Sequence, residues 1–250
     1  MEKRYDVLSL LAGAWCHQPR FSLPSNNNLQ NSKEVRLESL KPSVKSAKEA
    51  MNTFDAIRER RAIKSFDPNY QLTQQETEQL LELAMQAPSS FNIQHWRLVN
   101  VTDKALRAKL REAAHDQAQV TEASLLFVVA VDIKAWEKDP ARYWVNAPKD
   151  AQDILVPWIH PFYSGKEQLQ RDEAMRSAGI MLQTMMLSAK AMGYDSCPMV
   201  GFDFDKVAEL IHLPKDHAIA AMLVIGKAIK PAWPKPGFIP KTELVIENHF

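Results

Sequence analysis

Cysteine and glycine, two residue types that often mark a recognisable site, are scarce in this sequence. Its 250 residues include two cysteines, Cys16 and Cys197, which lie far apart in dissimilar contexts. They fit neither a disulfide framework nor a zinc site, and they agree with a reducing cytoplasm. The seven glycines form no Gly-rich phosphate loop of either common type. Disulfide-stapled, zinc-bound, P-loop and Rossmann proteins are therefore disfavoured.

The sequence also lacks net charge, long apolar runs and the motifs of hydrolases. Its 31 basic and 30 acidic residues give a net charge of +1, so no chain-wide field favours nucleic acid or an anionic membrane. Apolar runs such as residues 125–131 are too short to span a bilayer. The histidines make no HExxH spacing, and there is no GxSxG elbow. We expect a cytoplasmic protein with neither a nucleic-acid nor a membrane partner, and we assign no metal ligand.

The composition changes near residue 50. Residues 22–32 are rich in Ser, Pro and Asn, and residues 32–50 are lysine-rich and only weakly apolar. Such a stretch buries too little apolar surface to offset the entropy of ordering it. We expect residues 1–50 to be a flexible or loosely docked extension and residues 51–250 to be the folded domain. Met51 is one candidate for the natural start.

Helices are expected to dominate the folded part. Thr73 and Glu76 form a capping box before a run of apolar residues at helical spacing, which Pro88 ends. A long run of Met and Ala at three- and four-residue steps ends at Gly193, a natural C-terminal cap. We expect helices over 54–61, 73–87, 103–115 and 166–192.

Strands are expected between these helices. Continuous apolar runs favour buried strands, and alternation near the C-terminus favours a last one. We expect strands over 96–102, 125–131, 220–226 and 242–247, and an extended proline-rich stretch over 231–240. Strands interleaved with helices imply an α/β or α+β sandwich.

Three segments are candidates for a binding site. Residues 58–66 hold four cations in seven positions. This cluster is either a local anion site or a basic helix end exposed to solvent. Residues 88–96 form a polar loop after a proline, suited to a flat heteroaromatic ring, although Ser and Asn are also ordinary turn residues. Residues 194–202 are expected to turn tightly, exposing backbone N–H groups. We interpret Cys197 there as structural, because no neighbouring basic residue would lower its pKa.

The three segments occur in this order and at these intervals in the nitroreductase family of FMN enzymes, which residues 51–250 resemble. The stretches that carry the resemblance are RERRAIKSF, APSSFNIQHW and GYDSCPMVGF. It implies an α+β fold, a nitroreductase-like sandwich in which helices flank a central mixed sheet. It also implies an obligate homodimer with FMN at the interface. The implied activity is reduction of nitroaromatics, quinones or related small oxidants with NADH or NADPH, by ping-pong hydride transfer.

The resemblance also implies which residues meet the cofactor. The first segment is expected near phosphate, ribityl and ring edge, and the second is expected to reach FMN from the partner subunit. The third segment is expected to lie against the flavin ring. Lysines near the C-terminus are expected to complete the binding site for the phosphate. The implied cofactor-binding residues are Arg60, Arg61, Ala62, Lys64, Pro88, Ser89, Ser90, Asn92, Asp116, Gln119, Pro198, Met199, Val200, Gly201, Lys235 and Lys241. No side chain is assigned a catalytic role.

Some positions depart from the family pattern. Ala62 stands where relatives often have Ser, Val200 replaces an acidic residue of some relatives, and His95 replaces the usual Pro. Two alternatives remain beside the nitroreductase activity. One is another reaction on the same fold, such as flavin reduction, dehalogenation or flavin destruction. The other is a non-catalytic flavin-binding regulator.

Overall fold

The computed structural model describes residues 51–250, and the expected extension over residues 1–50 lies outside them. Its centre is a four-stranded sheet in the order β1-β2-β4-β3. The strands are β1 (Trp96–Asn100), β2 (Leu125–Asp132), β3 (Asp195–Met199) and β4 (His217–Gly226). All three strand pairs are antiparallel. The expected α+β class is confirmed, whereas the expectation of a mixed sheet is wrong for these four strands. A single parallel bridge, between Ala62 and Ser196, adjoins them.

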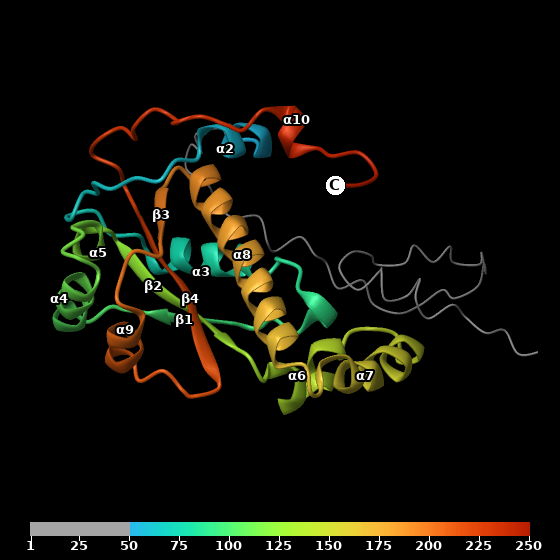
Figure 1. The fold of residues 1–250 in the computed structure, drawn as a ribbon. Helices are drawn as coiled ribbons and strands as arrows, with labels where there is room; N and C mark the ends of the chain where they lie inside the picture. The colour runs from blue at the N-terminus through green and yellow to red at the C-terminus, as the bar shows by residue number, and fades with distance from the viewer. Residues whose placement is uncertain (1–50) are drawn as a thin grey trace, which may run out of the picture.

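Strand β2 has side chains in both halves of the core because alternate residues point to opposite faces of the sheet. All eight of its residues are buried. Phe127 and Val129 pack with the helices α3 (Gln74–Ala84) and α8 (Glu167–Ala191). Leu126 and Val128 pack with α4 (Lys104–Ala113) and α9 (Phe204–Leu210) on the other face. Figure 1 shows α8 crossing one face of the sheet and α4 and α9 on the other side.

The caps read from the sequence form as expected. Thr73 and Glu76 make the reciprocal hydrogen bonds of a capping box at the start of α3. The Asp103 carboxylate accepts from Leu106 N at 2.6 Å and begins α4. Gly193 ends α8 with a φ of +83°, in the left-handed region that glycine enters freely. The predicted helices over these stretches and the predicted strands β1, β2 and β4 are confirmed.

Several elements were not expected from the sequence. Between β2 and α8 lie α6 (Ala135–Lys138), the 3-10 helix η4 (Pro140–Trp144) and α7 (Lys149–Tyr163). Two prolines inside α7 hide its helical pattern. The smaller unexpected elements are η3 (Ser90–Asn92), α5 (Gln119–Glu122) and α10 (Lys241–Leu244). Helix α2 (Thr53–Glu59) confirms the helix predicted over 54–61.

The predicted final strand over 242–247 is wrong. This stretch begins in α10, which ends at the exposed Leu244, and continues without regular structure through Val245 and Ile246, which are also exposed. The alternation that predicted a strand has no neighbouring strand to pair with among residues 51–250. Within the same residues, no helix is both long and apolar enough to cross a membrane.

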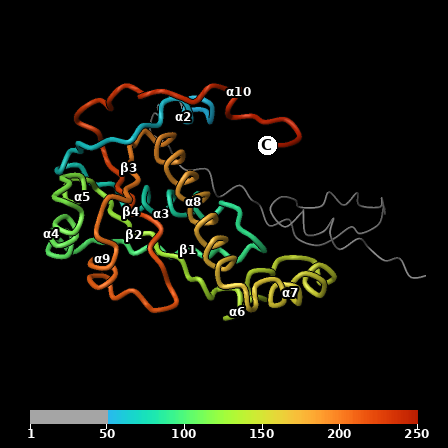
Figure 2. Tube along the Cα trace, viewed as in Figure 1, coloured from blue at the N-terminus to red at the C-terminus, as the bar shows by residue number. Residues whose placement is uncertain are grey.

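A third hydrophobic cluster lies apart from the two faces of the sheet. It joins Phe91 and Ile93 to residues of α6 and α7. Figures 1 and 2 place α6 and α7 at one end of the molecule, and α2 and the C-terminal segment at the other. Any residues of the candidate site that fall in these two groups are therefore separated within one chain.

Candidate functional site

The basic segment after α2 is held along the sheet edge by backbone contacts. Ile63 N donates to Ser196 O at 3.1 Å, and Phe66 forms an isolated bridge with Ala228. Ile63 and Phe66 are buried, whereas Lys64 between them is exposed. Both apolar side chains belong to the same core cluster, and they hold the segment against the core while Lys64 stays on the surface. The segment is thus more than a solvated helix end.

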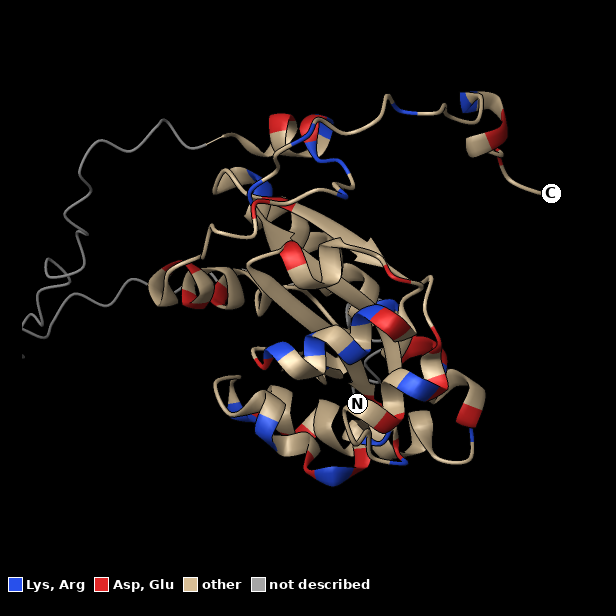
Figure 3. Cartoon of the chain, turned by 90° about the vertical axis from the view of Figure 1, so that its left-hand side faces the viewer, with Lys and Arg blue, Asp and Glu red and all other residues tan. Residues whose placement is uncertain are grey.

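The C-terminal segment crosses this basic segment and closes a pocket with it. The segment is extended and exposed over residues 233–240, as its prolines predicted. The Arg61 guanidinium donates to the carbonyl of Trp233, and Lys235 Nζ donates to Arg58 O at 3.3 Å. In Figure 3 Lys and Arg are marked in blue along both segments at the top of the molecule.

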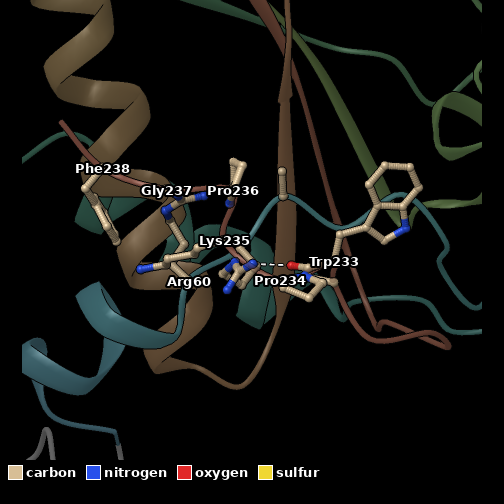
Figure 4. A pocket seen from close by; sticks show the side chains of 10 residues that line it. Arg60, Trp233, Pro234, Lys235, Pro236, Gly237 and Phe238 are labelled. Carbon is tan, nitrogen blue, oxygen red and sulfur yellow. Dashed lines mark hydrogen bonds between the residues drawn. The ribbon is translucent and has the colours of Figure 1, made fainter.

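The pocket has a volume of about 400 Å³ and contains cations without a carboxylate. Figure 4 shows Arg60 beside Lys235, with the indole of Trp233 turned away from them. The lining residues are Arg60, Arg61, Ala62, Ala232, Trp233, Pro234, Lys235, Pro236, Gly237 and Phe238. Two arginines and a lysine converging on one space can grip a phosphate through charge-assisted hydrogen bonds. The pocket is therefore suited to an anion.

The third segment forms a strand where a tight turn was expected. Residues 195–199 pair with β4 as the edge strand β3, in which Pro198 is tolerated because edge strands can lack a ladder donor. Pairing stops at Met199, and Val200 and Gly201 follow as the exposed turn. The parallel bridge between Ala62 and Ser196 places this strand beside the basic segment.

A polar turn before α5 meets the turn after β3. Gln117 Nε2 donates to Gly201 O at 2.9 Å, and the buried Gln119 donates to Gln117 Oε1 at 2.9 Å. Asp116 is exposed and its carboxylate pairs with Arg111 at 2.6 Å. Asp116 and Gln119 were predicted from the family resemblance, whereas Gln117 was not, because no motif distinguishes it from its neighbours. Gln117 is the residue of this turn that bonds directly to the Gly201 turn.

Cys197 is buried on β3, as expected for a structural cysteine. Burial raises the pKa of its thiol, while Lys64 and Arg60 oppose that rise. The prediction that Cys197 has no basic neighbour was wrong, because both cations come from a segment that is far away in the chain. Burial still outweighs them, so the thiol is held protonated rather than activated.

The Pro88 loop does not join these residues in the chain. Ser89 and Ser90 are buried, and Ser89 Oγ accepts from Gln94 N at 2.9 Å within the loop. Asn92 is exposed, and its Nδ2 donates to Tyr143 O of η4 at 2.8 Å. The loop thus packs with α6, η4 and α7. Lys241 likewise lies outside the pocket, at the exposed start of α10.

The structure therefore divides the predicted site residues into groups. The group at the pocket and the adjoining turns contains Arg60, Arg61, Ala62, Lys64, Gln119, Pro198, Met199, Val200, Gly201 and Lys235. Asp116 lies next to this group, on the turn of Gln117. The other group contains Pro88, Ser89, Ser90 and Asn92, and Lys241 stands apart from both.

Known proteins resemble this chain over most of its length. The model of the family described as "Nitroreductase family" matches residues 57–227. Protein DrgA of Synechocystis sp. is 56% identical over 200 residues, which cover 78% of this chain and 95% of that protein. MhqN of Bacillus subtilis, provisionally named an NAD(P)H nitroreductase, is 33% identical over 177 residues, covering 68% of this chain and 86% of its own.

A solved structure shows the same fold with a ligand. A provisionally assigned nitroreductase from Exiguobacterium sibiricum, in complex with FMN, superposes with a TM-score of 0.74 at 29% sequence identity. The match covers 79% of this chain and 97% of that one. The family match over residues 57–227 includes all four strands and the helices α3, α4, α8 and α9 on the two faces of the sheet.

Proposed function

The chain belongs to the nitroreductase family, and from this premise we propose that it is an FMN-dependent oxidoreductase. It uses NADH or NADPH to reduce nitroaromatics, quinones or related small acceptors, in two half-reactions at one site. The observation that carries the proposal is the carboxylate-free pocket where Arg60, Arg61 and Lys235 converge beside strand β3. The enzyme works in the cytoplasm, a reducing compartment that suits the free thiol of Cys197.

The residues present fit FMN. Its phosphate requires several cationic donors, and Arg60, Arg61 and Lys235 supply them without a competing carboxylate. The donor groups of Arg61 and Lys235, which contact the carbonyls of Trp233 and Arg58, would be available to hold the phosphate. Ala62 and the exposed residues Pro198, Val200 and Gly201 form the wall beside the ring.

FMN supplies hydride and electron transfer, and the protein supplies position and electrostatics. Lys64 is exposed on the same segment as the phosphate cations and stabilises negative charge on the reduced ring. Beyond Met199 the pairing with β4 ends, which frees the backbone N–H groups of Val200 and Gly201 to face the ring. Gln117 and Gln119 brace that turn. No side chain is assigned as acid or base.

The active form is a homodimer with FMN at the interface. The Pro88 loop, with its exposed Asn92, lies with α6 and α7, away from the pocket of its own chain. It therefore completes the site of the partner. The exposed apolar side chains Phe238, Leu244 and Ile246 of the C-terminal segment supply further contact area between subunits.

Simple measurements distinguish the proposed activity from two other functions. A flavin reductase, dehalogenase or flavin-destroying enzyme would share the pocket but would transfer electrons to another acceptor or consume the flavin. Steady NAD(P)H-dependent reduction of nitro compounds or quinones with FMN retained supports the proposal. A non-catalytic flavin-binding regulator would hold FMN that NAD(P)H never bleaches under anaerobic conditions.

The test of the pocket is the double variant Arg60→Ala/Arg61→Ala. One hydrogen bond from a charged group contributes about 1.5–3 kcal/mol. Losing two therefore weakens FMN binding by about a hundredfold or more. The measurement is titration of apo-protein with FMN. Lys104→Ala/Lys109→Ala removes two exposed cations of α4 and should leave the affinity unchanged. Wild-type affinity in the Arg60/Arg61 variant, or a wild type that never takes up FMN, would refute the assignment.

A further inference from the structure

The loop between η3 and β1 has an unusual backbone. Phe91, Asn92 and Gln94 have φ values of 49°, 54° and 51°, in the left-handed region. None of the three is glycine, and bulky side chains rarely adopt this conformation. The loop therefore needs contacts from outside itself to stay in this shape.

The principal support is a group of aromatic side chains around Tyr163, here called the Tyr163 cluster. Tyr163, at the end of α7, is fully buried. Its ring centroid lies 6.1 Å from that of Phe91, and the Phe162 ring lies 5.2 Å from Phe91 in an edge-on arrangement. Trp136 of α6 stacks on Tyr163 at 5.9 Å, and His95 contacts it edge-on at 6.5 Å. Tyr163 thus touches the loop on one side and α6 on the other.

A second contact from the same part of the chain holds Asn92. Its side-chain amide donates to the carbonyl of Tyr143 in η4 at 2.8 Å. The bond fixes how the amide is turned while the residue stays exposed. The left-handed turn at Phe91 and Asn92 is therefore anchored at both residues by the segment that runs from α6 to α7.

We propose that Tyr163 is a positioning residue for cofactor binding. Its ring packs on Phe91 and thereby fixes the left-handed turn at Phe91 and Asn92, so that the Asn92 side chain is held in the position from which it contacts FMN. This inference rests on the proposed function, in which Asn92 contacts FMN. The ring, and not the hydroxyl, does this work. Among residues 51–250 the ring packs on Phe91, Trp136 and Phe162, whereas the buried hydroxyl makes no full hydrogen bond and has the Ser90 side chain as its polar neighbour.

The first test compares two substitutions at one position. Tyr163→Leu removes the ring and is expected to raise the dissociation constant for FMN about tenfold, because the turn no longer holds one shape. Tyr163→Phe keeps the ring and is expected to restore affinity to within about twofold of wild type. The measurement is titration of FMN into apo-protein. Equal losses in both variants would assign the effect to the hydroxyl and overturn the proposal.

The second test asks whether Tyr163 acts through Asn92. Asn92→Ala is expected to weaken FMN binding by itself, and adding Tyr163→Leu should weaken it by less than Tyr163→Leu does in the wild-type protein. The loss of melting temperature caused by Tyr163→Leu should persist in both backgrounds. Additive losses of affinity would mean that Tyr163 acts by general destabilisation, which contradicts positioning. Val129→Ala, in the buried centre of β2, is the control that lowers melting temperature without changing FMN affinity.

If Tyr163→Leu does not fold, Phe91→Leu is used in its place. It removes the other ring of the same contact and should show the same dependence on Asn92. A wild-type protein that binds no FMN would refute the proposed function itself. A wild type that binds FMN, with Tyr163→Leu or Phe91→Leu at wild-type affinity, would refute only the role of Tyr163.

Discussion

His95 is a fully buried imidazole at the base of the Pro88 loop, in the position where the family usually has proline. Neither of its ring nitrogens has a hydrogen-bond partner within residues 51–250. Burial lowers the pKa of His95 from 6.5 to about 4, with Asp132 opposing the shift and Arg97 adding to it. The side chain is therefore neutral at physiological pH and acquires charge only at a cost to the fold.

The pH dependence of stability should report this histidine. Because its pKa is lower in the folded state than in the unfolded state, its contribution is complete above pH 6.5 and is lost as pH falls toward 4. The loss amounts to about 3 kcal/mol in the free energy of unfolding. Urea unfolding measures the free energy of unfolding at each pH. Between pH 7 and 4 this free energy should fall by about 3 kcal/mol less in His95→Leu than in the wild-type protein. Identical acid limbs in both proteins would show that His95 does not titrate in this way.

Individual residues were predicted from the sequence only where their neighbours in the chain determine their role. Thr73 and Glu76 cap a helix through purely local hydrogen bonds, so the pattern was enough. The environment of Cys197 was missed in part, because Lys64 and Arg60 approach it from across the fold. Gln117 was missed for the same reason: its partner is the carbonyl of Gly201.

At the scale of elements, helices α3 and α8 are joined by a polar contact that no motif indicated. The Tyr194 hydroxyl, just after α8, donates to the Glu76 carboxylate in the first turn of α3. It also lies 3.2 Å from the Tyr70 hydroxyl, and Lys227 Nζ lies 4.5 Å from the Tyr194 ring centroid. Residues from three parts of the chain thus fix the end of α8 against the start of α3.

Tyr194→Phe should weaken this junction while leaving the core intact. The variant loses a hydrogen bond to a charged group, and because Glu76 is partly exposed the cost is about 1 kcal/mol in the free energy of unfolding. Tyr70→Phe, which removes only the neutral hydroxyl pair, should cost less. Chemical unfolding of the wild type, Tyr194→Phe and Tyr70→Phe gives their free energies of unfolding and hence the order of the two losses. A larger loss in Tyr70→Phe would contradict this account.

Elements with strong periodicity were predictable and those whose pattern is interrupted were not. Helix α8 and strand β2 follow single patterns over their whole length. Helix α7 contains Pro157 and Pro161 and depends on packing of Ile159 and Tyr163 against the Pro88 loop. Strand β3 contains a proline and exists because β4 pairs with it. Tertiary contacts decide such elements, and one sequence does not reveal them.

At the scale of the whole molecule, the C-terminal segment is the part that one chain leaves uncovered. Residues 233–250 are all exposed, and several carry large apolar side chains. The segment still supplies Lys235 to the pocket and a carbonyl to Arg61. It is therefore unnecessary for the core and necessary for the candidate site.

A chain ending at Ala232 should separate these two roles. None of the removed residues is buried, so far-ultraviolet circular dichroism and cooperative unfolding should be retained. FMN affinity should fall by at least tenfold with the loss of Lys235, and the proposed dimer should weaken or dissociate. Light scattering and FMN titration measure the two effects. A truncated protein that remains a tight, FMN-binding dimer would contradict both roles.

The pocket that joins Arg60 to Lys235 also has a consequence for biosynthesis. A ribosome makes Arg60 early and Lys235 near the end, whereas the last strand, β4, is complete at Gly226. Because Lys235 follows β4 by only a few residues, the last strand of the sheet and the last cation of the pocket leave the ribosome almost together. We therefore expect the proposed phosphate site to be complete only after the whole chain has been released, so that FMN is captured after synthesis and not during it.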